Sequence, residues 1–149
     1  MPDVRYLPIV WQRLVSAGGD TCPRCRGTGD EVMRAVERLK ATLAPAGVTP
    51  VLEIRELDEA DFLRRPSESN RIWIAGHPLE SWLEGQTGSS RCCSECGDND
   101  CRTLELGGKA YEVIPEALIV RAGLIAAARM LDESALATRC ADEAPDRER

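Results

Sequence analysis

Apolar and polar positions alternate along residues 7–15, which predicts a largely buried β-strand that closes in the turn-forming sequence Ser-Ala-Gly-Gly-Asp. From Thr28 onward the apolar residues recur every three or four positions, which predicts an amphipathic helix. Thr28 is followed three residues later by Glu31, as in a capping box, so we expect the helix to begin there. The sequence Pro-Ala-Gly at residues 45–47 is expected to end it.

Short strands and helices continue to alternate after this helix. Residues 50–55 begin with proline and have one apolar and one charged face, which predicts an outer strand. Residues 58–65 predict a short helix, and residues 71–76, apolar on both faces, predict a central strand. One short helical turn is expected at residues 78–83, and residues 85–91 are expected to form a loop.

The last third of the chain predicts a hairpin followed by a long helix. Residues 103–106 and 110–114 flank a Gly-Gly pair, which is typical of a β-hairpin turn. Residues 115–131 begin with proline and are rich in Ala, Leu and Ile, which predicts the final helix. The polar residues 132–149 are expected to form a flexible tail.

Length and charge narrow the class of protein. With 149 residues, the chain has the length of one globular domain. Its net charge of -6 and its interspersed acidic and basic residues argue against nucleic acid or a membrane surface as the partner, because both call for a basic patch. We recognise neither a secretory signal nor an apolar segment long enough to span a bilayer, and therefore expect a cytoplasmic protein. In that reducing compartment, seven cysteines favour metal binding or transient redox chemistry over static disulfides.

The first two cysteines, Cys22 and Cys25, form a C-x-x-C motif between the first predicted strand and the first predicted helix. Two thiols at this spacing can close a disulfide or bind one metal ion, and the position between a strand and a helix indicates thiol redox chemistry. The motif continues as C-x-x-C-x-G-x-G, which resembles one zinc-binding repeat of the Hsp40 co-chaperones. Zinc therefore stays an alternative for this pair.

A second group contains Cys92, Cys93, Cys96 and Cys101. Four thiolates in so short a segment can surround a tetrahedral zinc ion at Zn–S distances of about 2.3 Å, and they would also bind Cu(I) or other thiophilic ions. An iron–sulfur cluster is a further alternative, although no ferredoxin spacing is present. The adjacent side chains of Cys92 and Cys93 point apart, so one of them could reach toward the first pair. Three arrangements stay open: a metal site within residues 92–101, a site shared by both groups, and a relay of disulfides between them.

The order of the predicted elements, with C-x-x-C after the first strand, resembles that of a thioredoxin-like domain. The chain also resembles a small cysteine-rich prokaryotic family of unknown function that is placed near the thioredoxin-like proteins. The residues that carry this resemblance are Trp11-Gln12-Arg13-Leu14, Thr21-Cys22-Pro23-Arg24-Cys25, Ser69-Asn70-Arg71-Ile72, Cys92-Cys93-Ser94-Glu95-Cys96 with Cys101-Arg102, and Tyr111-Glu112-Val113-Ile114-Pro115. It implies an α/β, thioredoxin-like fold over residues 1–131, with a central mixed sheet of about four strands flanked by helices. A cysteine-rich insertion at residues 84–102 would precede the final hairpin.

The resemblance also implies roles for the first cysteine pair. Cys22 would be the attacking thiolate and Cys25 the resolving thiol, with Arg24 or Arg26 nearby to hold the negative charge. A helix that begins only at Thr28 would weaken the effect of the helix dipole on Cys22, because that effect is confined to the first turn.

A second departure concerns the position before the third strand. Thioredoxin-like enzymes carry a cis-proline there, whereas this chain has Ser69 and Asn70. A cis bond between two non-proline residues costs about 3 kcal/mol, so we expect an ordinary trans peptide. His77, the only histidine, is interpreted as a turn residue, and Cys140 as a thiol outside both groups.

We therefore expect a thioredoxin-like thiol–disulfide redox protein, an oxidoreductase if it is enzymatic. Cys22 and Cys25 would be the catalytic pair and would react with a thiol or disulfide protein or with a small soft electrophile. Cys92, Cys93, Cys96 and Cys101 would bind a metal, with zinc as the candidate cofactor, or would act as a second redox centre. The alternative is a non-catalytic protein that binds zinc or a thiophilic metal or metalloid through both cysteine groups.

Overall fold

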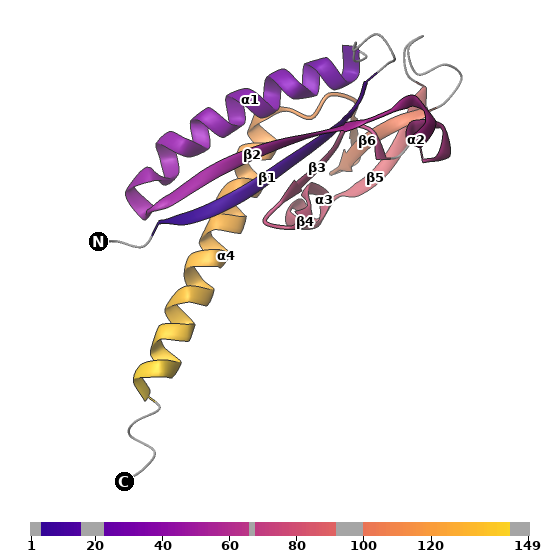
Figure 1. Ribbon diagram of the computed structural model, residues 1–149. Helices are drawn as coiled ribbons and strands as arrows, with labels where there is room; N and C mark the ends of the chain where they lie inside the picture. Colours follow the sequence, from indigo (N-terminus) through magenta and orange to yellow (C-terminus); the bar gives the residue numbers. More distant parts are fainter. Residues whose placement is uncertain (1–3, 16–22, 66–67, 92–99, 144–149) are drawn as a thin grey trace.

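The computed structural model describes residues 4–15, 23–65, 68–91 and 100–143. The described chain combines a four-stranded mixed sheet, a smaller three-stranded sheet and two long helices (Figure 1). The elements, in chain order, are β1 (Arg5–Leu14), α1 (Pro23–Leu43), the 3₁₀ helix η1 (Ala44–Ala46), β2 (Val48–Leu57), α2 (Glu59–Arg64), β3 (Arg71–Ile74), β4 (His77–Pro78), α3 (Leu79–Leu83), β5 (Gln86–Arg91), β6 (Asp100–Leu106), β7 (Lys109–Tyr111) and α4 (Glu116–Glu143).

The central sheet has the strand order β2-β1-β3-β4. β1 and β2 are parallel and are joined by α1, because parallel neighbours require a crossover connection. β3 runs antiparallel to β1, and the short β4 runs antiparallel to β3. The predictions of an outer strand near residues 50–55 and of a central strand from residue 71 are therefore confirmed, as is the short helix at 78–83.

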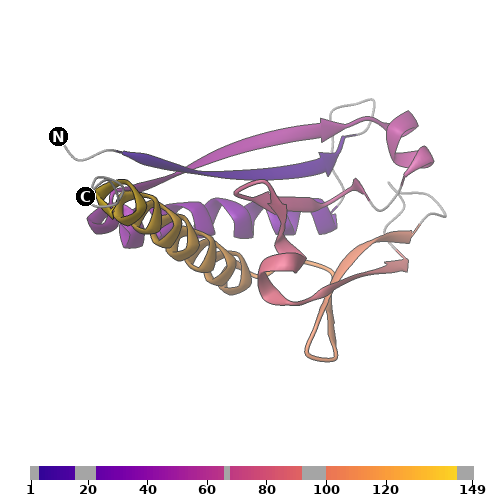
Figure 2. The ribbon, with the colours of Figure 1, turned by 90° about the horizontal axis from the view of Figure 1, so that it is seen from below.

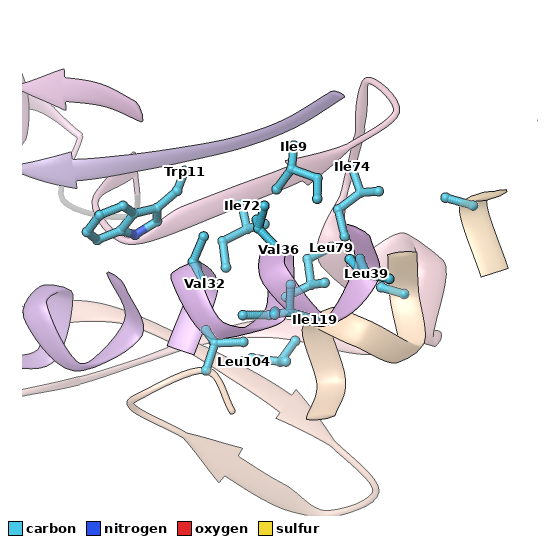
Figure 3. Close-up of a cluster of buried hydrophobic side chains, with 14 of the residues drawn as sticks. Ile9, Trp11, Val32, Val36, Leu39, Ile72, Ile74, Leu79, Leu104 and Ile119 are labelled. Atoms are coloured by element: carbon cyan, nitrogen blue, oxygen red, sulfur yellow. The ribbon is translucent and has the colours of Figure 1, made fainter. Parts of the chain in front are cut away.

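Both long helices pack on the same face of the central sheet (Figure 2). The side chains of β1 that face the helices, such as Leu7 and Ile9, are fully buried, whereas Tyr6 on the opposite face is 62% exposed. Figure 3 shows the resulting core, in which residues of β1 and β3 meet α1, with Ile119 of α4 and Leu104 of β6 at its lower boundary. Apolar residues thus alternate along β1 because one face of the strand is buried, as expected from the sequence.

The second sheet has the order β5-β6-β7 and is antiparallel throughout. The predicted hairpin is present: Leu106 pairs with Lys109 across Gly107 and Gly108, whose positive φ angles of 60° and 79° suit a two-residue turn. One expectation was wrong, because residues 86–91 form a strand rather than a loop. The hairpin pairs with that strand in the second sheet.

The helix boundaries also differ from those expected. α1 begins at Pro23 instead of Thr28, so the capping box does not form and Thr28 is fully buried inside the helix. α4 continues to Glu143, well into the segment that was expected to be a tail. None of the helices in the described part of the chain combines the length and the apolar character needed to cross a membrane.

Candidate functional site

The first cysteine motif coincides with the start of α1. The helix begins at Pro23, the residue directly after Cys22, and proline suits this position because the first helical N–H groups have no partner within the helix. Cys25 lies in the first turn and is 2% exposed, and that turn contains no acidic residue. Cys22 itself lies outside the described residues. The chain therefore places Cys25 where backbone N–H groups and the helix dipole favour negative charge.

Arg24 connects this helix start to the second cysteine group. Its side chain is only 7% exposed, and Nη1 donates hydrogen bonds to the carbonyl oxygens of Cys101 at 3.3 Å and Ser90 at 3.4 Å. Nη2 forms an ion pair with Glu112 at 3.3 Å. Ser90 and Cys101 are register partners in β5 and β6, on either side of residues 92–99. One guanidinium group thus holds both strand ends that border the second cysteine segment.

The structure describes one member of the second group, Cys101, which is 2% exposed at the start of β6. The other three members, Cys92, Cys93 and Cys96, lie outside the described residues. Arg24 brings the element that carries Cys25 against the element that carries Cys101. The sequence alone left open whether the two cysteine groups are neighbours. The Arg24 contacts show that Cys25 of the first group and Cys101 of the second lie on elements that touch each other.

A buried polar network lies behind the first turn of α1. Asn70 donates from Nδ2 to Thr28 Oγ1 at 3.0 Å and accepts from Trp11 Nε1 at 3.2 Å. The backbone N–H of Ile114 donates to the same Thr28 oxygen at 3.1 Å. Asn70 adopts a positive φ of 56°, and the peptide bond that precedes it is trans, as expected from the sequence. These contacts join β1, α1 and the segments before β3 and α4.

The glycines of the C-x-x-C-x-G-x-G pattern have a packing role. Both lie inside α1, where glycine has a low intrinsic preference. A Cβ on Gly29 would come within 2.5 Å of the Trp11 ring, and one on Gly27 within 3.0 Å of the Val113 side chain. The close approach of the helix to β1 therefore requires glycine at position 29, whereas a side chain at position 27 would require only a small shift of Val113. The two glycines of the pattern thus contact neighbouring elements inside a helix.

Sequence reasoning missed a buried ion pair next to Cys101. Arg102 contacts Glu80 of α3, and the two side chains are only 11% and 12% exposed. Arg102 also donates to Thr87 Oγ1 at 2.8 Å. The pKa of Arg102 is lowered to about 10: burial is the largest cause, the positive charge of Arg71 also lowers the pKa, and the carboxylate of Glu68 acts in the opposite direction. The pair fixes β6 to α3, and no local sequence signal could have linked residues so far apart.

The described residues contain no group of three or more His, Cys, Asp or Glu side chains arranged to hold a metal ion. His77 is exposed at the start of β4, and its ring makes an edge contact with Trp82 at a centroid distance of 5.6 Å. Trp11 and Trp73 lie on the neighbouring strands β1 and β3. The guanidinium carbon of Arg71 lies over the Trp73 ring, 4.5 Å from the ring centroid.

Comparison with known proteins places these features in a family. A family model described as a domain of unknown function (DUF2703) matches residues 7–123. An uncharacterized protein of Archaeoglobus fulgidus is 43% identical over 113 residues, which cover 76% of this chain and 82% of that protein. No solved structure matches the chain.

Proposed function

The chain belongs to the DUF2703 family, and we propose that it is a thiol–disulfide redox protein in which Cys22 attacks and Cys25 resolves. The observation that carries this proposal is the start of α1 at Pro23, directly after Cys22. It removes the objection that the helix begins too late to act on the motif. A thiolate at a helix N-terminus is stabilised by the dipole and by unpaired N–H groups, and the thiolate is the attacking species.

The burial of Cys25 supports its assignment as the resolving thiol. At 2% exposure it is shielded from an external disulfide. The Cys22 sulfur of a mixed disulfide would be within its reach, because the two residues are one helical turn apart in sequence. The buried guanidinium of Arg24 lies between them in the chain, and a cationic side chain nearby favours a thiolate.

The order of elements supports a thioredoxin-like fold. A parallel β1-α1-β2 unit is followed by α2, the antiparallel pair β3 and β4, and a long final helix. The cysteine-rich segment at residues 92–99 and the sheet around it are inserted before that helix. Asn70, at the position of the cis-proline, ties β3 to α1 through its side chain and so takes a structural role at this point.

The reaction has two exchange steps. The Cys22 thiolate attacks one sulfur of a disulfide, which forms a mixed disulfide and releases the other sulfur as a thiolate. Cys25 then loses its proton, and its thiolate attacks Cys22, which forms the Cys22–Cys25 disulfide and releases the second thiolate. The substrate disulfide gains the two electrons that the cysteine pair loses. The partner would be a disulfide protein or a small soft electrophile.

The test is the reaction of the reduced protein with a chromogenic aromatic disulfide, with each modified cysteine located by peptide mass spectrometry. In Cys25→Ser we expect the mixed disulfide to persist on Cys22, whereas the unchanged protein proceeds to the Cys22–Cys25 disulfide. Cys22→Ser should lose the fast phase while its circular dichroism is unchanged, and Cys140→Ser is the matched control. A fast phase that is retained in Cys22→Ser would remove Cys22 from the mechanism.

A second candidate function is the binding of zinc or another thiophilic ion by both cysteine groups. It is favoured by Arg24, which holds the start of α1 against the two strand ends that border residues 92–99. Cysteine thiolates are the ligands that such ions prefer, and a shared site would connect α1 to the second sheet. In this case no turnover is expected.

Native mass spectrometry of protein purified without air or chelator distinguishes the two candidates. For a shared site, Cys22→Ser should lower both the bound zinc and the unfolding free energy, because metal affinity is then part of the folding free energy. Cys140→Ser, outside both groups, should change neither. Zinc content that is unchanged by Cys22→Ser would rule out a shared site and leave the redox proposal.

A further inference from the structure

β2 is the outermost strand of the central sheet, ten residues long, and no other strand of the described part of the chain pairs with its outer edge (Figure 2). The mean strand in globular proteins has only about five or six residues. An uncovered edge presents N–H and C=O groups that can pair with another strand. The sequence of β2 decides which partner strand would fit this edge.

The hydrogen bonds to β1 identify the groups that point outward. Arg5 N donates to Gly47 O at 3.1 Å, and Val15 N donates to Leu57 O at 2.9 Å. The register between these two points is continuous, without a bulge. Backbone groups alternate in direction along a strand. The N–H and C=O groups of the odd-numbered residues within 47–57 therefore point toward β1.

The even-numbered residues therefore direct their backbone groups away from the sheet. They include Leu52, Ile54 and Glu56, each with one outward N–H and one outward C=O. Pro50 belongs to the same set, and a proline without N–H is tolerated at an edge. The outward hydrogen-bonding segment is thus centred on Ile54, whose side chain is 45% exposed.

This segment is complementary to itself. In an antiparallel pair of two β2 strands with a twofold axis at Ile54, Glu53 lies opposite Arg55 of the second copy, and Arg55 opposite its Glu53. Both side chains are more than half exposed and already form an ion pair at 3.1 Å within one chain, so neither is committed to the core. Opposite charges in directly facing positions stabilise such pairs. The two Ile54 residues then form the central hydrogen-bonded pair, as twofold symmetry requires.

Other positions of the axis fit less well. An axis at Glu53 or at Arg55 places two like charges opposite each other, which is destabilising. An axis at Leu52 places Ile54 opposite Pro50, which lacks the required donor. Charge complementarity and the positions of the outward hydrogen-bonding groups therefore both favour a twofold axis at Ile54.

We propose that the protein forms a twofold-symmetric homodimer by antiparallel pairing of β2 about Ile54. The two central sheets join into one continuous sheet, and the exposed Ile54 side chains cover each other. The occupant of the edge is a second copy of this chain, because the facing residues repeat the same Glu53 and Arg55 pair twice. The proposal does not depend on the chemistry of the cysteines.

Charge reversal tests the pairing directly. We expect light scattering coupled to size-exclusion chromatography to give a dimer for the unchanged chain. Glu53→Arg and Arg55→Glu should each weaken self-association about tenfold or more, because each variant places like charges opposite each other twice. A mixture of the two single variants should form a heterodimer, and the double variant should again form a homodimer. Lys40→Glu, an exposed reversal on α1, is the control and should leave the dimer intact.

A second variant tests the hydrogen bonds. Ile54→Pro removes an outward N–H while leaving the bonds to β1 in place, so the chain should fold with unchanged circular dichroism and be monomeric. A chain that is monomeric at about 1 mM would overturn the proposal. So would a dimer that persists in both single charge variants, because its contact would then lie elsewhere. Recovery of dimer in the mixture shows that the single variants are folded.

Discussion

Asn70 donates its side-chain amide to the hydroxyl oxygen of Thr28 at 3.0 Å, so the residue before β3 is tied to the interior of α1. Thr28 is fully buried, and its oxygen also accepts from the backbone N–H of Ile114. One hydroxyl group therefore satisfies two donors from distant parts of the chain. A buried donor that loses its acceptor costs about 1–3 kcal/mol, which makes this oxygen a sensitive point of the fold.

Thr28→Val keeps the shape of the side chain and removes this acceptor. We expect it to lower the free energy of unfolding by about 2–4 kcal/mol, because the Asn70 and Ile114 donors stay buried without their common partner. Urea unfolding monitored by circular dichroism measures the change. Thr28→Ser, which retains the oxygen and loses one methyl group, is the control and should cost about 1 kcal/mol. Equal losses in both variants would mean that packing, not hydrogen bonding, is what Thr28 contributes.

A methyl group at Gly29 is predicted to be more harmful than one at Gly27. In an exposed helix, Gly→Ala stabilises by about 1 kcal/mol. At Gly29 the new Cβ would meet the Trp11 ring at 2.5 Å, and that ring is held by its hydrogen bond to Asn70. We expect Gly29→Ala to destabilise by about 1–3 kcal/mol.

Gly27→Ala meets only the end of the Val113 side chain, at 3.0 Å, and should cost clearly less. The two unfolding midpoints, compared in one denaturant, provide the check. If Gly29→Ala is as stable as the unchanged protein, the Trp11 ring is free to move and does not require glycine at this position.

These residues show what sequence patterns reveal and what they leave out. The strands with one buried face and the amphipathic part of α1 were predicted correctly, because burial on one face produces the periodicity. The start of α1 was not predicted correctly. Thr28 and Glu31 have the residue types of a capping box, but the Thr28 side chain forms a tertiary hydrogen bond with Asn70 instead of capping the helix. A local motif cannot show that its side chain is needed by a residue 42 positions away.

The candidate site, like the fold, could be predicted only in part from the sequence. The C-x-x-C motif was recognised from its spacing alone, but its overlap with the first turn of α1 was not, because the helix was expected to begin only at Thr28. The role of Arg24 was not found, because its partners Ser90 and Cys101 are brought to it only by the packing of β5 and β6 against α1. The strand at residues 86–91, rich in Gly, Ser and Thr, carries no apolar alternation and so was taken for a loop.

The ion pair of Arg102 and Glu80 should respond strongly to loss of one partner. Removal of the carboxylate in Glu80→Ala leaves a buried guanidinium without its counter-ion, and such changes cost about 3–5 kcal/mol. Glu37→Ala, which breaks the exposed pair with Lys40, should change the free energy of unfolding by no more than about 0.5 kcal/mol. Thermal unfolding of the two variants measures both. A small effect at Glu80 would mean that water replaces the carboxylate around Arg102.

Arg24 is predicted to control access to Cys101. Arg24→Met keeps much of the buried stem and removes the donors to the carbonyl oxygens of Ser90 and Cys101. Hydrogen bonds from a charged donor contribute about 1.5–3 kcal/mol each, so loss of both should make local opening of the strand ends at least about 100-fold more frequent. Alkylation of Cys101, followed by peptide mass spectrometry under native conditions, reports this opening because the thiol is 2% exposed in the closed state.

The matched control is Arg26→Met, two residues further along the same motif, where the side chain is exposed. It changes the charge near the cysteines equally but removes no contact to β5 or β6, so Cys101 should be alkylated at the rate of the unchanged protein. If both variants accelerate alkylation equally, the effect is electrostatic and Arg24 does not hold the strand ends. If only Arg24→Met does so, the buried guanidinium is the physical link between the two cysteine groups, because its loss releases one group from the other while the fold persists.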